Sequence, residues 1–130
     1  LAEKHPDRYQ PDLALSLNNL SVHLSDAGDR DGALAAIQQA VDIRRRLAEK
    51  HPDRYQPDLA LSLNNLSNRL SDAGDREGAR AALVEAMDLL QPYAERYPGS
   101  PAGAWFETMK GNLKRLEDDG DEANAPEASA

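Results

Sequence analysis

Residues 1–21 read LAEKHPDRYQPDLALSLNNLS, and residues 47–67 read the same. The agreement continues beyond this block, because positions 1–46 and 47–92 are identical at 34 of 46 places. The offset of 46 persists more faintly toward the end, where Lys114-Arg115-Leu116 aligns with Asn68-Arg69-Leu70. Self-similarity at a fixed period is the signature of a repeat architecture. The chain therefore holds two full units and the first half of a third.

Each unit reads as two helices joined by a short turn. Leucines recur at spacings of four, three and four along the first half of the unit (Leu13, Leu17, Leu20 and Leu24), which is helical periodicity. Gly28 is expected to end this helix and Asp29 to cap the next one. Because proline is tolerated in a first turn, we expect the first helix to open at Gln10-Pro11-Asp12.

These elements predict an all-α fold, a right-handed α-solenoid of antiparallel helix pairs. The repeat domain is expected over residues 1–119, with units at about 11–50 and 57–97 and a capping half unit at 102–119. Pro92 should end or kink the fourth helix. Residues 120–130 are acidic and lack periodicity, so they are expected to form a disordered tail.

The composition excludes several classes of function. The net charge of -8 arises mostly from acids near the end, since 15 basic and 17 acidic residues remain before Glu117. Without a basic patch we expect no nucleic acid and no membrane surface as partner. There is no cysteine, no apolar run of about 20 residues and no signal-peptide pattern, so a cytoplasmic protein is expected.

The residues along each unit resemble the tetratricopeptide repeat signature. In the first unit they are Leu17, Leu20, Ser21, Leu24, Gly28, Ala33, Ile37 and Ala40, and in the second Leu63, Leu66, Ser67, Leu70, Gly74, Ala79, Leu83 and Ala86. A period of 46 exceeds the usual 34. With this period and the strings Leu17-Asn18-Asn19-Leu20 and His51-Pro52-Asp53, the repeat unit looks like the kinesin-light-chain type of long repeat, as found in bacterial arrays. The resemblance covers about residues 11–119.

The resemblance implies a module that presents a concave groove to a peptide or a partner domain. It places six residues on the concave side: Leu15, Asn19, Val22, Leu61, Asn65 and Asn68. Side-chain amides offer both a donor and an acceptor, so Asn19 and Asn65 could hold the backbone of an extended peptide. Alternatively, the asparagines bond neighbouring helices or face water.

Charged residues add two further expectations. Lys110 and Lys114 match Asn64 and Asn68 at the repeat offset, so they could attract an acidic peptide to one end of the groove, or simply form a solvated helix face. The run Arg44-Arg45-Arg46 lies late in a helix, where cations suit the helix dipole, although an acidic partner is an alternative.

No arrangement of residues points to an enzyme, a metal or a cofactor. The histidines lack a second ligand at metal spacing, and the serines have no base in recognisable relation to them. The rival hypothesis is a self-assembly or spacer array that regulates an attached signalling or enzyme domain. Because residues 1–10 match the end of a second helix and its linker, we also expect apolar surface around Leu13 and Leu20 to stay open. Self-association through this N-terminal end would then follow, as a homodimer or as an exchange of helices between chains. The alternative is that residues 1–9 fold back and cover the gap within one chain.

Overall fold

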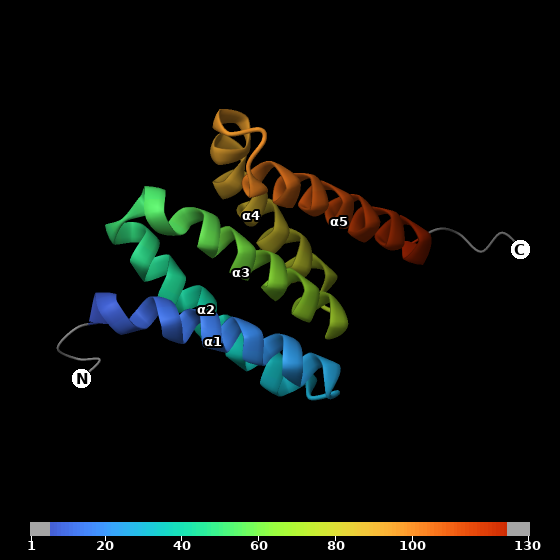
Figure 1. Ribbon diagram of the computed structural model, residues 1–130. Coiled ribbons are helices and arrows are strands. Elements are labelled where there is room, and N and C mark those ends of the chain that lie inside the picture. Colours follow the sequence, from blue (N-terminus) through green and yellow to red (C-terminus); the bar gives the residue numbers. More distant parts are fainter. Residues whose placement is uncertain (1–5, 125–130) are drawn as a thin grey trace, which may run out of the picture.

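The computed structural model describes residues 6–124, and the burial of side chains from Tyr9 to Asp118. Within that part of the chain every element is a helix, in the order α1 (Pro6–Asp26), α2 (Arg30–Lys50), α3 (Pro52–Asp72), α4 (Arg76–Arg96) and α5 (Pro101–Asn124). Each helix packs on the next one in the sequence, so the array runs from α1 at one end to α5 at the other (Figure 1). This confirms the expected α-solenoid of antiparallel helix pairs.

The turn inside each pair is built from one short motif. Gly28 adopts a φ of 87° and Gly74 a φ of 85°, a left-handed conformation that glycine takes at little cost. The Asp29 amide then donates to the Leu24 carbonyl at 2.8 Å, which closes the end of α1. The Asp29 carboxylate accepts from the Gly32 amide at 2.9 Å and caps α2. Both expectations for this turn are confirmed.

Small residues set the distance between the paired helices. The Ser21 hydroxyl donates to the Ala33 carbonyl at 2.7 Å, and Ser67 donates to the Ala79 carbonyl at the same distance. All four residues are buried. A side-chain hydroxyl can reach a backbone carbonyl of the facing helix only where the two backbones approach closely, so this contact explains why serine faces alanine in both units.

The helices begin earlier than the prolines suggested. We expected openings near Pro11 and Pro57, but α1 and α3 start five residues before, at Pro6 and Pro52. Pro57 is the sixth residue of α3, and it removes the one hydrogen bond that an amide at this place would donate to the Asp53 carbonyl. Contacts from outside hold the added turn, because Tyr55 is buried and the Tyr93 hydroxyl donates to Gln56 Oε1 at 2.9 Å.

The later boundaries also differ from expectation. Helix α4 continues through Pro92 to Arg96, so this proline does not end it. Helix α5 extends to Asn124 and thus into the segment expected to be a disordered tail from residue 120. The rest of that expected tail, residues 125–130, lies outside the described residues.

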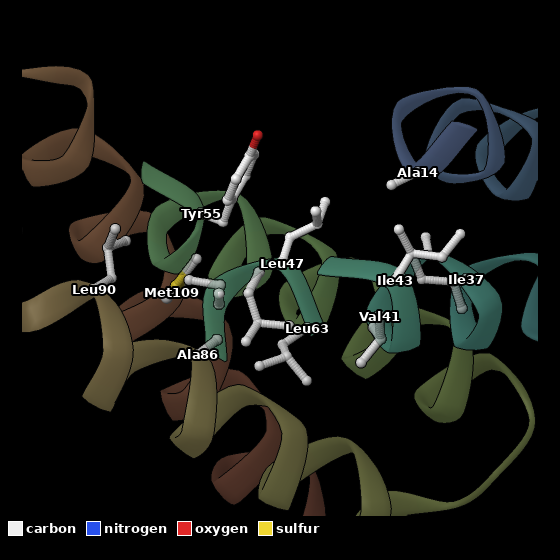
Figure 2. Packing of buried hydrophobic residues seen from close by; sticks show 14 of the residues in the cluster. Ala14, Ile37, Val41, Ile43, Leu47, Tyr55, Leu63, Ala86, Leu90 and Met109 are labelled. Carbon is white, nitrogen blue, oxygen red and sulfur yellow. The ribbon is translucent and has the colours of Figure 1, made fainter. Parts of the chain in front are cut away.

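One hydrophobic core runs along the whole array. It begins at Ala14 on α1, passes through Ile37 and Leu47 on α2, and reaches Met109 on α5 (Figure 2). The chain therefore has no separate domain core for each unit. A helix in the middle of the array packs on two neighbours, whereas in the described structure α1 packs mainly on α2 and α5 mainly on α4.

Candidate interaction surfaces

The first candidate surface follows the first helix of each unit, α1, α3 and α5, and we call it the inner surface. On α1 it consists of Leu15, Asn19 and Val22, which share a face because they are spaced by four and three residues. All three are exposed, and the two apolar side chains flank the amide. The structure therefore brings together the three α1 residues that the sequence proposed.

On α3 the corresponding residues are less accessible. Asn65 is only 8% exposed, and its amide makes a long hydrogen bond of 3.4 Å to the Asn18 carbonyl of α1. Ser62 donates to Asn18 Oδ1 at 3.2 Å in the same contact. Asn65 thus joins two helices in this structure, which was the alternative role considered for the asparagines, and Asn19 remains accessible. Leu61 and Asn68 are half-buried.

On α5 the inner surface becomes charged. Lys110 pairs with Glu107 at 3.3 Å and lies 5.7 Å from the centre of the Phe106 ring. Lys114 is exposed. Asn112 donates to Asn64 Oδ1 at 3.3 Å, and this contact joins α5 to α3. The inner surface therefore changes from apolar on α1 to charged on α5.

Sequence reasoning missed Glu107, although a signal for it was available. At the repeat offset of 46, Glu107 occupies the position of Leu15 and Leu61, just as Lys114 occupies that of Val22 and Asn68. The α5 end of the surface thus has an acid and a base where the α1 end has two apolar residues. Aligning all three units position by position would have shown this.

The arginine run serves contacts between helices. Arg44 is buried and donates to the Asp58 carbonyl at 3.1 Å and to the Ser62 hydroxyl at 2.8 Å. Its burial lowers the pKa of the Arg44 guanidinium, which the neighbouring Asp58 charge partly opposes. Arg45 binds both carboxylate oxygens of Glu85, at 2.6 and 3.2 Å, and this hydrogen bonding raises the Arg45 pKa. Arg46 is exposed.

The second candidate surface is the outer stripe of α1, defined as Tyr9, Asp12, Leu13, Ser16 and Leu20. These residues lie along one side of α1, and all are exposed. Leu13 and Leu20 are 48% and 45% exposed, so the expectation of open apolar surface around them is confirmed.

No other chemistry stands out among the described residues. They contain no group of three His, Cys, Asp or Glu side chains placed to hold a metal ion. Within the same part of the chain, no helix is both long and apolar enough to cross a membrane. An open cleft of about 540 Å³ lies between the end of α4 and the start of α5, with Glu95, Ser100 and Phe106 among its lining residues.

The stacked helix pairs and the exposed helix faces define a helical-repeat protein of the solenoid class. A family model described as tetratricopeptide repeat matches residues 13–53 and 59–91, which is more than half of the chain. The chain belongs to the tetratricopeptide repeat family. No curated protein and no solved structure gives a significant match to it. The kinesin-light-chain type of the repeat stays a prediction.

Proposed function

We propose that the chain is a protein-interaction module whose inner surface binds an elongated peptide or a segment of a partner domain. Tetratricopeptide repeats generally serve as protein-interaction modules, so the class of function follows from the family. The observation that supports this particular surface is the exposed pair Leu15 and Val22, which flank Asn19 on one face of α1.

The gradient along the inner surface indicates the chemistry of the ligand. Apolar side chains of the ligand lie against Leu15 and Val22, and the Asn19 amide pairs with its backbone. At the other end Lys114 favours an acidic group, whereas the charge of Lys110 is partly neutralised by Glu107. Asn65 contributes through the α1–α3 contact and not by touching the ligand, because it is buried.

The test is a selection of peptides from a random library on the full chain, followed by calorimetry on the peptides that bind. The variant Leu15→Glu should weaken binding at least tenfold, since it places a charge in an apolar contact. Lys114→Glu should shift the selected sequences away from acidic residues. Gln39→Glu, on an exposed position of α2, is the matched control and should leave affinity unchanged. Selected peptides that bind all these variants equally would contradict the proposal.

A second candidate function is self-assembly, in which the array serves as a spacer or forms a homodimer through its α1 end. The exposed outer stripe of α1 is the observation that favours it. Sedimentation equilibrium over a wide concentration range tests it, because a dimer held by this stripe should dissociate on dilution. A Leu13→Glu variant should then be monomeric at concentrations where the parent chain is dimeric.

A further inference from the structure

Asn18 on α1 and Asn64 on α3 are separated by the repeat period of 46, so they occupy the same place in their units. Both are half-buried and lie along the inner surface, Asn64 between Leu61 and Asn68 at helical spacing. In each asparagine the side-chain oxygen Oδ1 accepts a hydrogen bond from a neighbouring helix. Neither side-chain nitrogen Nδ2 has a partner among the described residues, and neither is fully buried. The groups that hold the two oxygens therefore decide what the two nitrogens present.

The oxygen of Asn64 is fixed by a chain of hydrogen bonds that begins at Arg115. The Arg115 guanidinium donates to Asn112 Oδ1 at 3.0 Å, and Asn112 Nδ2 donates to Asn64 Oδ1 at 3.3 Å. Because an arginine has donors and no acceptor, it turns the oxygen of Asn112 toward itself and the nitrogen of Asn112 toward α3. Asn64 must then meet that nitrogen with its own oxygen. Its two N–H donors are left for the inner surface.

The oxygen of Asn18 is fixed by a second chain, which begins at Arg44. Arg44 Nη1 donates to the Ser62 hydroxyl at 2.8 Å, and this hydroxyl donates to Asn18 Oδ1 at 3.2 Å. Ser62 is completely buried, so its single proton needs an acceptor, and the Asn18 oxygen supplies one. The Asn18 carbonyl also accepts from Asn65 Nδ2 at 3.4 Å, which holds the same turn of α1. The N–H donors of the Asn18 side chain are thus left free as well.

The two chains share no residue, and neither is a copy of the other. At the repeat offset Ser62 corresponds to Thr108, whose hydroxyl donates to a carbonyl of its own helix at 3.1 Å. Asn112 corresponds to Leu66, which has no polar side chain. Helix α3 contacts α1 on one side and receives the hydrogen bond from α5 on the other, so the open nitrogen of Asn64 does not result from a missing neighbour. Different residues therefore leave two equivalent asparagines in the same state.

We propose that Arg44 and Arg115 are positioning residues, which orient the side chains of Asn18 and Asn64 so that both present N–H donors to the ligand of the inner surface. The ligand is then an extended peptide segment that directs backbone carbonyl oxygens at two places one repeat apart. Asn19 differs, because it is exposed and no hydrogen bond fixes its amide among the described residues. This role rests on the proposed function and specifies which atoms of the peptide the surface selects.

The first test uses the NMR signals of the side-chain amides in the full chain without ligand. Arg115 is exposed, so Arg115→Leu should fold normally, and it should shift the amide signal of Asn64 while that of Asn18 stays in place. Arg115→Lys keeps a group with donors only and should retain the parent signal. Arg46→Leu, at an exposed position of α2, is the matched control and should move neither signal. An Asn64 signal that Arg115→Leu leaves unchanged would overturn the proposal.

The chain that begins at Arg44 is tested at two of its links. Arg44→Leu introduces the residue that the second unit has at this place, Leu90, and Ser62→Ala breaks the chain without removing a buried charge. Each variant should shift the Asn18 signal and leave that of Asn64 unchanged. Ser62→Ala decides the matter even where loss of the arginine unfolds the chain. An unchanged Asn18 signal in Ser62→Ala, or equal movement of both signals, would contradict the positioning role.

The second test is calorimetry with the tightest peptide selected from the random library on the full chain. Asn112→Leu breaks the chain from Arg115 without a change of charge, and leucine is the residue that the other two units have at this place. It should weaken binding by about threefold to tenfold, as should Arg115→Leu. Asn64→Asp replaces the free donors with an acceptor and should weaken binding at least tenfold. A loss in Arg115→Leu that is absent in Asn112→Leu would mean that the arginine acts through its own charge, and the proposal would be wrong.

The outcome is separable from that of the proposed function. Leu15→Glu tests the inner surface as a whole and changes no member of either chain. Peptides that bind this variant as tightly as the parent would reject the proposed function, whereas the amide signals of the chain without ligand report the orientation of Asn18 and Asn64 in any case. Peptides that Leu15→Glu weakens and Asn112→Leu does not would reject the positioning role alone.

Discussion

In the first turns of α2 and α4, the carboxylate of the capping aspartate occupies the space beside a glycine, which is the third residue of the helix. A Cβ atom on Gly32 would lie too close to the Asp29 carboxylate, and Gly78 has the same relation to Asp75. We expect Gly32→Ala to displace the cap and to lower the free energy of unfolding by up to about 1 kcal/mol. Gly111→Ala, in open space on α5, should raise it by about 0.5–1 kcal/mol. Denaturant titration of both variants measures the difference, and equal stabilisation by the two would refute the cap argument.

At this same scale, Asn65 and Arg44 mark the limit of what the sequence could predict. Helical periodicity assigns a residue to a face, and on that basis Asn19 and Asn65 are equivalent. Whether a face meets water or another helix depends on the neighbours in the array, so Asn65 is buried and Asn19 is exposed. Arg44 was assigned to the helix end, but it lies at a contact with a helix that follows it in the sequence. The exposure of Leu15, Asn19 and Val22 on α1 needed no such knowledge, because no described element covers them.

At the scale of the elements, the close crossing of α3 and α4 depends on the small side chain of Ala79. Ala79 is completely buried, and its carbonyl accepts from Ser67 at 2.7 Å. We expect Ala79→Leu to overpack the crossing and to lower the free energy of unfolding by about 1–3 kcal/mol. Ala81→Leu, at an exposed position of the same helix, is the control and should change stability little. Thermal melting that ranks the two variants equally would reject this role of Ala79.

The helix pairs, their turns and their close contacts could be predicted because each rests on a local rule. Glycine follows the helix end, aspartate caps the next helix, and small residues recur at the crossings. The helix starts could not be predicted in the same way. Pro57 was interpreted as a helix start and Pro92 as a place where the helix ends or kinks, yet α3 begins before Pro57 and α4 continues through Pro92. Long-range contacts such as Tyr93 to Gln56 stabilise the added turns, and no local rule contains them.

At the scale of the whole molecule, the array is a row in which each helix depends on its neighbours. The stability of such a row is approximately a sum of unit and nearest-neighbour terms, so an end unit opens more readily than an internal one. Helix α3 packs against both α2 and α4, whereas α1 packs mainly against α2. The exposed outer stripe and the lower expected local stability of α1 therefore have one cause, which is packing against a single main neighbour in the described structure.

Hydrogen exchange can test this dependence with unusual precision, because the chain contains its own control. Residues 9–21 and 55–67 have the same sequence, so apart from their flanking residues their amides have equal intrinsic exchange rates. We expect amides around Leu17 to exchange at least tenfold faster than those around Leu63, a difference of about 1.4 kcal/mol in opening free energy.

NMR resolves the two copies, and in mass spectrometry peptides that extend to Val22 or Asn68 have different masses. Dilute protein excludes self-association as a source of protection. Equal protection of the two copies in dilute protein would mean that packing mainly against α2 stabilises α1 as fully as two neighbours stabilise α3.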